Sequence, residues 1–205
     1  MAGQLKVGGN IIASHSGVEG AGTVNLQNVT LGDSSVVFPA GHVIQVVYNQ
    51  KTDREALSTS SWTDIPGTDQ DGNGSLFSAS ITPTSASNKI FVTVNLEGSG
   101  GEARYVFGVR LYRGVIPIGL SDQIGTTRPQ TFMSSGQQNW ENYGRNNLSN
   151  SFLDSPNSTS EQTYSLKVWD SRDNGTVYIN RAYYDGDNTA VPTGTSSIIL
   201  MEIQQ

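Results

Sequence analysis

Residues 89–96, with the sequence KIFVTVNL, place Ile90, Val92, Val94 and Leu96 on one side of the chain and Lys89, Phe91, Thr93 and Asn95 on the other. Because side chains of a strand point alternately to opposite faces, this period of two predicts a β-strand with one buried face. Similar alternation predicts strands at Tyr105–Leu111, Tyr164–Val168 and Val177–Ile179. Further strand candidates are Val43–Tyr48, Trp62–Ile65, Leu76–Ile81, Val115–Leu120 and Ser197–Ile203. No segment longer than ten residues has the apolar spacing of a helix, so helices are expected to be short or absent.

Turn-forming residues separate these strands. They occur at Pro66-Gly67, Asp71-Gly72-Asn73-Gly74, Arg113-Gly114, Asp173-Asn174-Gly175 and Asp185-Gly186-Asp187-Asn188. Such residues tolerate a positive φ or hydrogen-bond to their own backbone, which suits them to hairpins. Many short strands joined in this way predict an all-β fold, specifically an antiparallel β-sandwich of jelly-roll type.

Composition excludes several classes of protein. The 205 residues carry 12 Lys and Arg against 18 Asp and Glu, a net charge of −6, without a basic cluster, which disfavours nucleic acid as a partner. The absence of cysteine excludes disulfides, thiolate metal sites and cysteine nucleophiles. No apolar run approaches the roughly 18 residues of a membrane-spanning helix, so no membrane insertion is expected. The first residues also lack the pattern of a secretory signal.

The N-terminal region differs from the rest of the chain. Six glycines lie within its first 22 residues, and no large aromatic residue precedes Phe38. So little apolar surface cannot offset the entropy of ordering a separate core. We therefore expect residues 1–41 to form an extended arm held by a neighbouring molecule, and residues 42–205 to form the β-sandwich domain. Alternatively, the arm adds a strand to its own sandwich.

Residues 121–160 form a polar stretch rich in Ser, Asn and Gln that contains scattered aromatic residues, namely Phe132, Trp140, Tyr143 and Phe152. Structureless loops of this length are uncommon inside compact domains. The stretch is therefore either a displayed binding loop or a pair of strands with a weak pattern. In a displayed loop, Trp140 and Tyr143 would be candidates for stacking against sugars, whereas in strands either could be a core residue.

The last predicted strand, Ser197–Ile203, is apolar on both faces. Its two sets are Ile199, Met201 and Ile203 on one face, and Ile198, Leu200 and Glu202 on the other. A sandwich strand normally has one apolar face. We therefore expect one face to pack in the core and the second against another subunit. The alternative is a central strand covered by a loop.

The sequence gives little support for catalysis. Its two histidines, His15 and His42, lie beside glycine-rich segments, and no nucleophile elbow of the G-x-S-x-G kind is present. The candidate carboxylates are Asp64, Asp69, Asp71, Glu97, Glu102, Asp122, Asp154, Asp170, Asp173, Asp185 and Asp187. Nearly all lie in predicted turns, where Asp is expected for backbone reasons. We predict no enzyme activity, no catalytic residue and no cofactor.

One turn resembles part of a calcium loop. Asp69, Asp71 and Asn73, followed by Gly74, match the first half of the pattern D-x-[DN]-x-[DN]-G. Ser80 stands where the bidentate Glu of such a loop is expected, and the flanking segments are predicted strands. A hairpin turn is favoured, and metal binding by these three residues is left open.

Several segments together resemble virion proteins of tailed bacteriophages, particularly marine ones. They are Ile81–Leu96, Leu111–Gly119, Tyr164–Trp169, Gly175–Arg181 and Ser196–Ile203, together with the opening residues Met1–Asn10 and Asn28–Asp33. The resemblance implies a trimeric, fibre- or knob-like jelly-roll domain displayed on the particle. It brings no catalytic residues with it.

These observations lead to the hypothesis of a bacteriophage structural protein located in the virion and assembled in the host cytoplasm. The chain would be a homotrimer whose arm docks to other virion proteins of the capsid or tail. Its sandwich would be displayed and could bind a glycan or protein of the host surface. The alternatives are a capsid decoration protein without host binding, a free carbohydrate-binding module and a glycan hydrolase with two converging carboxylates.

Overall fold

The computed structural model describes residues 3–7, 10–15, 39–101, 106–136, 144–171, 175–187, 189 and 191–205. The chain divides into two compact units, Met1–Phe38 and Pro39–Gln205. In the first unit, β1 (Gly3–Val7) and β2 (Asn10–His15) pair with each other in an antiparallel two-stranded sheet. The docking role of residues 1–41 stays a prediction. Gly41 donates its backbone N–H to the carbonyl of Gln204 at 2.7 Å, so residues 39–41 belong with the second unit.

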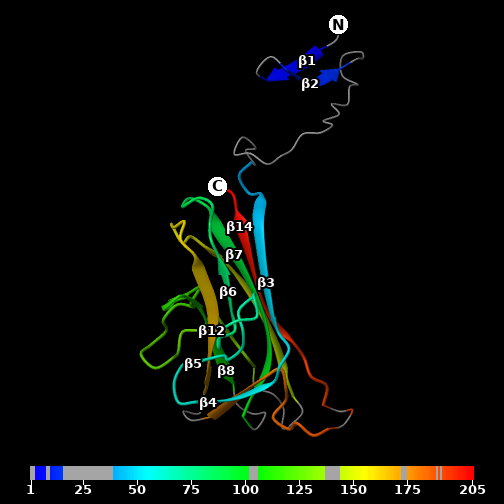
Figure 1. Ribbon diagram of the computed structural model, residues 1–205. Coiled ribbons are helices and arrows are strands. Elements are labelled where there is room, and N and C mark those ends of the chain that lie inside the picture. The colour runs from blue at the N-terminus through cyan, green and yellow to red at the C-terminus, as the bar shows by residue number, and fades with distance from the viewer. Residues whose placement is uncertain are drawn as a thin grey trace. The chain divides into compact units, whose positions relative to one another are not determined.

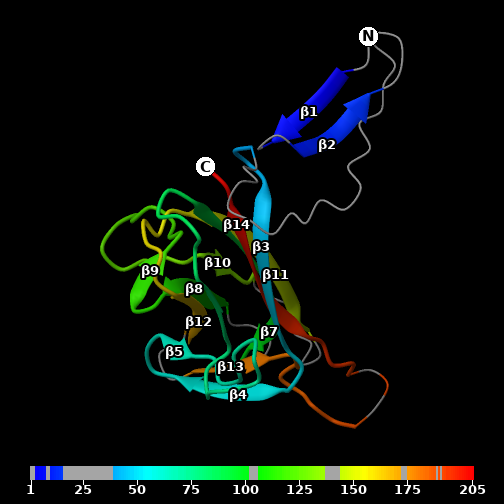
Figure 2. The ribbon, with the colours of Figure 1, turned by 45° about the horizontal axis from the view of Figure 1, so that its top comes forward.

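The second unit consists of two antiparallel sheets, which Figures 1 and 2 show as facing layers. One sheet contains β3 (Val43–Lys51), β4 (Glu55–Thr59), β7 (Lys89–Gly100), β11 (Asn146–Asp154), β13 (Gly175–Ile179) and β14 (Ser196–Ile203). The other contains β5 (Thr63–Asp64), β6 (Ser78–Ile81), β8 (Phe107–Arg113), β9 (Ile116–Ile118), β10 (Met133–Ser134) and β12 (Gln162–Asp170). Among the described residues, all regular secondary structure is β.

The connectivity is that of a jelly roll. The first strand of this unit, β3, pairs with the last, β14, which in turn pairs with β7, and β11 lies along the other side of β7. In the facing sheet, β12 lies between β8 and the short strands β5 and β6. Among the described strands, six of the eleven connections from β3 to β14 pass from one sheet to the other. These pairings confirm the predicted antiparallel β-sandwich of jelly-roll type.

The core lies between the two sheets, and alternation determines which side chains enter it. In β7, Ile90, Val92, Val94 and Leu96 are fully buried, as the period of two predicts. From the facing sheet they meet side chains such as Leu111 of β8 and Leu166 of β12, which belong to the same hydrophobic cluster. Burying each such side chain contributes about 1.5–3 kcal/mol, so this face of the central strands dominates the stability of the unit.

Among the described strands, β1, β2, β4, β10 and β11 were not predicted from the sequence. Within residues 121–160, β11 pairs with β7 along its whole length, so residues 146–154 are not a displayed loop. Only Leu148 and Phe152 of β11 pack against the core, which leaves too weak an alternation to detect. Likewise β4 has one large apolar residue, Leu57. Trp140 and Tyr143, like Tyr105, lie outside the described residues.

No helix in the described part of the chain is long and apolar enough to cross a membrane.

Candidate functional site

The turn at Asp69–Gly74 is fixed by its own first carboxylate. Asp69 Oδ1 accepts the backbone N–H groups of Asp71 at 3.0 Å and of Asn73 at 2.8 Å. The backbone N–H of Asp69 also donates to the carbonyl of Asn73 at 2.7 Å. These bonds are the local side-chain caps that make Asp a frequent turn residue. The described residues contain no group of three or more His, Asp or Glu placed to hold a metal ion.

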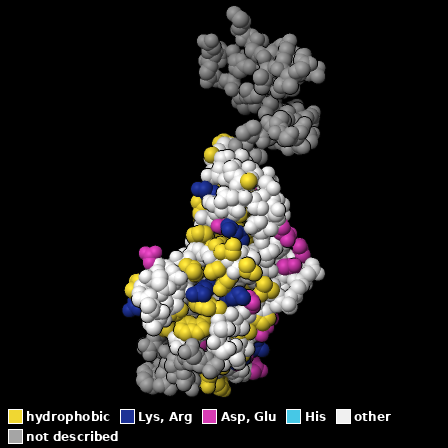
Figure 3. Space-filling model, turned by 90° about the vertical axis from the view of Figure 1, so that its left-hand side faces the viewer, with side chains coloured by type: hydrophobic (Ala, Val, Ile, Leu, Met, Phe, Trp, Pro, Cys, Tyr) yellow, Lys and Arg dark blue, Asp and Glu magenta, His cyan; other side chains and the backbone are white. Residues whose placement is uncertain are grey.

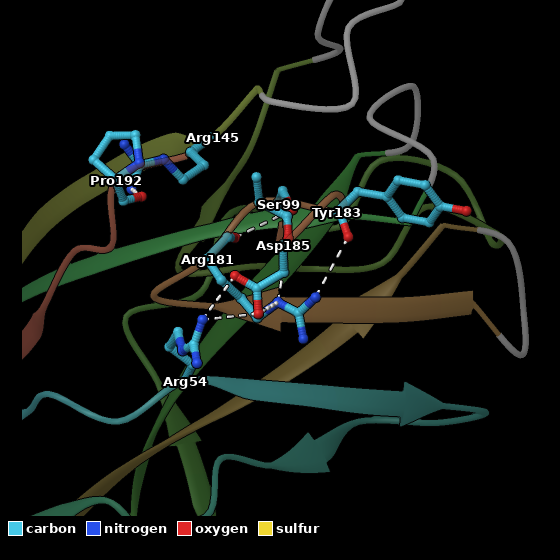
Figure 4. Close-up of polar contacts among 8 residues, drawn as sticks. Arg54, Ser99, Arg145, Arg181, Tyr183, Asp185 and Pro192 are labelled. Atoms are coloured by element: carbon cyan, nitrogen blue, oxygen red, sulfur yellow. Dashed lines mark hydrogen bonds and ion pairs between the residues drawn. The ribbon is translucent and has the colours of Figure 1, made fainter. Parts of the chain in front are cut away.

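Another candidate carboxylate, Asp185, ties the segment after β13 to the start of β4 (Figure 4). Arg54 Nη1 donates to both oxygens of Asp185, at 2.9 and 3.0 Å, and Arg181 Nε lies 3.3 Å from Oδ2. The Arg181 guanidinium also lies 4.9 Å from the ring centroid of Tyr178, which meets Tyr183 edge to face. The carboxylate is thus used to order a loop, and this role was not visible in the sequence.

A buried polar cluster connects the two sheets. Asp154, at the end of β11, accepts hydrogen bonds from Arg113 Nη1 at 2.8 and 2.7 Å and from the Tyr164 hydroxyl at 2.7 Å. Arg113 and Tyr164 belong to the facing sheet. We call these three residues the inter-sheet clamp. A nearby open depression of about 480 Å³ contains one carboxylate, Glu161, and so lacks the pair that glycoside hydrolysis needs.

Alkaline pH should destabilise the fold through Tyr164. Burial raises the pKa of its hydroxyl above the ordinary value of 10.0, and the hydrogen bond to Asp154 raises it further. The unfolded chain therefore releases this proton at a lower pH than the folded chain. The resulting contribution to stability is complete below about pH 10 and is lost as pH rises above it.

We expect this one group to reduce the free energy of unfolding by up to about 1.4 kcal/mol per pH unit above pH 10. Urea unfolding of the wild type and of Tyr164→Phe between about pH 9 and about pH 11 measures the effect. The variant should show the shallower decline. Equal slopes for the two proteins would contradict the assignment.

The outer surface of the sheet that contains β14 is apolar. Met201 of β14 lies opposite both Val46 of β3 and Phe91 of β7, and Phe91 lies opposite Leu153 of β11, so one apolar row crosses four strands. Directly opposed residues share a face of the sheet. The whole set, which we call the apolar outer face, is Val43, Val46, Tyr48, Phe91, Leu153, Ile199, Met201 and Ile203.

The apolar outer face is accessible to solvent. Val46 is 57% exposed, Tyr48 51% and Leu153 47%. On the inner side of the same strand β14, Ile198 and Leu200 are fully buried. The predicted division of β14 into a core face and a second apolar face is therefore confirmed, and so is its central place between β3 and β7. Contact of the second face with another subunit stays a prediction.

The opposite outer surface carries two tryptophans. The rings of Trp62 and Trp169 lie 6.1 Å apart at an angle of 35°, and the Arg110 guanidinium lies 4.0 Å from the Trp62 ring centroid. In register, Trp169 is opposite Gly108, and a Cβ on this glycine would lie 3.1 Å from the Trp62 ring. Gly108 therefore gives the indole room to lie against the sheet.

We call Trp62, Trp169 and Arg110, with the neighbouring Lys167, the tryptophan platform. Figure 3 shows this side of the molecule, where hydrophobic and Lys or Arg side chains are intermixed. Trp140 and Tyr143, which were candidates for sugar stacking or for the core, lie outside the described residues, so that prediction stays open. One signal was present: since Leu166 and Val168 point inward, alternation alone places Trp169 on the outer face.

Comparisons with known proteins give no family. No family model matches the chain, and no curated protein matches it. Among solved structures, one of infectious bursal disease virus, Gx strain, is similar at 12% identity and a TM-score of 0.36. The match covers 96% of this chain and 47% of that chain, so the present chain spans about half the length of that protein.

Proposed function

We propose that this chain is a structural protein of a virus particle, of the bacteriophage fibre or knob kind, which assembles as a homotrimer through its apolar outer face. The apolar outer face is the observation that carries the proposal. Contiguous exposed apolar surface on a folded domain marks an interaction site, because its exposure to water is unfavourable. The resemblance of the sequence to virion proteins of tailed bacteriophages supports the same role.

The two units take different tasks in this proposal. The first unit, Met1–Phe38, docks the protein to other virion proteins of the capsid or tail. The β-sandwich is displayed on the particle and binds the host surface. Three copies multiply weak contacts with a repetitive surface through effective concentration, so each site need not bind tightly.

Val46→Asp tests the homotrimer. A carboxylate in the middle of an apolar interface would have to be desolvated without a partner, which costs several kcal/mol per subunit. We expect the wild type to have about three times the chain mass of 21.9 kDa in light scattering, and the variant to have the mass of one chain. Both should keep the same far-ultraviolet circular dichroism.

Val115→Asp is the matched control, since it makes the same change at a residue that is 90% exposed and lies in the turn between β8 and β9, away from the face. It should retain the mass of the wild type. A wild-type mass near 21.9 kDa that does not change with concentration would overturn the proposed assembly.

A further inference from the structure

The tryptophan platform presents hydrogen-bond donors around an aromatic surface. Trp62 and Trp169 are each partly exposed, and neither indole N–H has a hydrogen-bond partner within the described residues. No buried side-chain nitrogen or oxygen there lacks a partner, so both indole N–H groups reach solvent. The platform therefore has two rings with their polar edges available to a ligand.

Arg110 is held in place by two contacts, which leave the N–H groups of its terminal nitrogens available to a ligand. Its Nε–H donates to the carbonyl of Gln130 at 2.8 Å, and its guanidinium stacks on Trp62. Its terminal nitrogens make no hydrogen bond to the described part of the protein. A guanidinium fixed in this way loses little entropy when it binds a carboxylate or sulfate through two parallel hydrogen bonds.

Lys167 adds a second cation beside the rings. Its ammonium lies 5.2 Å from the ring centroid of Tyr112 and donates to Asp64 at 3.0 Å. An ammonium has three donors, so this contact leaves others for a ligand. In a chain with a net charge of −6, a surface where cations outnumber acids is complementary to a negatively charged partner.

We propose that the tryptophan platform binds an acidic saccharide, with a sugar ring packed on the indoles and its carboxylate or sulfate held by Arg110. The apolar C–H face of a sugar suits an aromatic ring, and its hydroxyls can accept from the indole N–H groups. Two cations are too few to hold a nucleic acid strand, whose affinity depends on neutralising many phosphates. The proposal deepens the host-surface role given above and rests on it only for the source of the saccharide.

The experiment uses the purified full chain. Binding is measured by calorimetry with alginate oligosaccharides, which carry carboxylates, with neutral dextran oligosaccharides and with oligo-dT. A glycan array adds sialylated and sulfated sugars. We expect alginate to bind at least about tenfold more tightly than dextran in dilute salt, and this preference to shrink as salt screens the charges. Oligo-dT should not bind.

Substitutions locate the binding. Trp62→Ala and Trp169→Ala should each weaken alginate binding about tenfold, as expected when a stacked ring is lost. Trp169→Phe should retain most of it, which separates loss of the ring from loss of folding. Arg110→Gln should weaken alginate binding and leave dextran binding unchanged. Tyr184→Ala, which removes an aromatic side chain that is 45% exposed elsewhere, is the control and should bind as the wild type does.

Several results would overturn the proposal. They are equal affinity for alginate and dextran, binding of oligo-dT at the same site, unchanged binding in both Trp→Ala variants, or no binding to any acidic glycan. A change in molecular mass caused by Trp169→Ala would instead identify a second copy of the chain as the occupant, and would also overturn it. A monomeric wild type that binds alginate through Trp169 would overturn the homotrimer and keep this inference.

Discussion

Replacing Asp154 with alanine should lower the free energy of unfolding by about 3–5 kcal/mol, the cost of leaving one partner of a buried ion pair unpaired. Asp154 is 5% exposed and is the only acceptor that joins Arg113 and Tyr164 in the clamp. Without it, a guanidinium that is 21% exposed and a fully buried hydroxyl both lose their charged partner. Because Asp154 ends β11 and its partners lie in the facing sheet, the loss acts where the two layers are joined.

Urea unfolding at a fixed chain concentration measures this effect, since assembly makes the apparent stability depend on concentration. Asp64→Ala is the matched control. It also removes an Asp from an ion pair, with Lys167 at 3.0 Å, but Asp64 is half exposed. Exposed pairs contribute about 0–1 kcal/mol, so the control should be close to the wild type. Equal losses in the two variants would show that the clamp is not a buried pair in solution.

A double variant separates the pair from its packing. Arg113→Met combined with Asp154→Leu replaces the charges by apolar side chains of similar size. Such replacements of buried ion pairs are often neutral or stabilising. We expect the double variant to recover part of the stability lost in Asp154→Ala, since the buried Tyr164 hydroxyl still lacks the partner that Asp154 supplies. Such recovery would show that Asp154→Ala lowers the free energy of unfolding mainly because a buried charge is left unpaired, and not because a cavity forms.

The sequence predicted those strands in which several large apolar side chains alternate with polar ones. Ile90, Val92 and Val94 reveal β7 because burial selects every second residue. The same rule fails for β11, whose place beside β7 depends mostly on backbone hydrogen bonds and only weakly on Leu148 and Phe152. A strand that is held mainly by backbone hydrogen bonds has only a weak alternation of apolar and polar residues, so its sequence does not reveal it.

The surfaces were predictable to different extents. The two apolar faces of β14 could be predicted from the sequence of that strand alone, because Ile199 and Met201 are apolar where a polar residue is expected. The tryptophan platform could not be predicted from one strand, because the approach of Trp62 to Trp169 depends on how β5 and β12 are brought together in register. Contacts between segments about a hundred residues apart are set by the fold, and local patterns do not contain them.

Glu202, on the inner face of β14, holds the turn that connects the two sheets between β6 and β7. Its Oε1 accepts the backbone N–H of Thr84 at 2.7 Å, the Thr84 hydroxyl at 2.8 Å and the Asn88 side-chain amide at 2.7 Å. Thr84 and Asn88 lie in the turn from β6 to β7, where the chain crosses from one sheet to the other. Glu202 is fully buried and Asn88 nearly so.

Glu202→Ala should therefore lower the free energy of unfolding by about 2–4 kcal/mol, since bonds to a carboxyl group are lost and the buried Asn88 amide loses a partner. Glu161→Ala, the same change at an exposed side chain, should stay within about 0.5 kcal/mol of the wild type. Urea unfolding compares the two, and similar midpoints would contradict the role of Glu202. At low denaturant, Glu202→Ala should keep the wild-type mass, because Met201 and Ile199 point to the opposite face. The inner side of β14 would then determine how firmly the sandwich is closed, and its outer side whether the sandwich assembles.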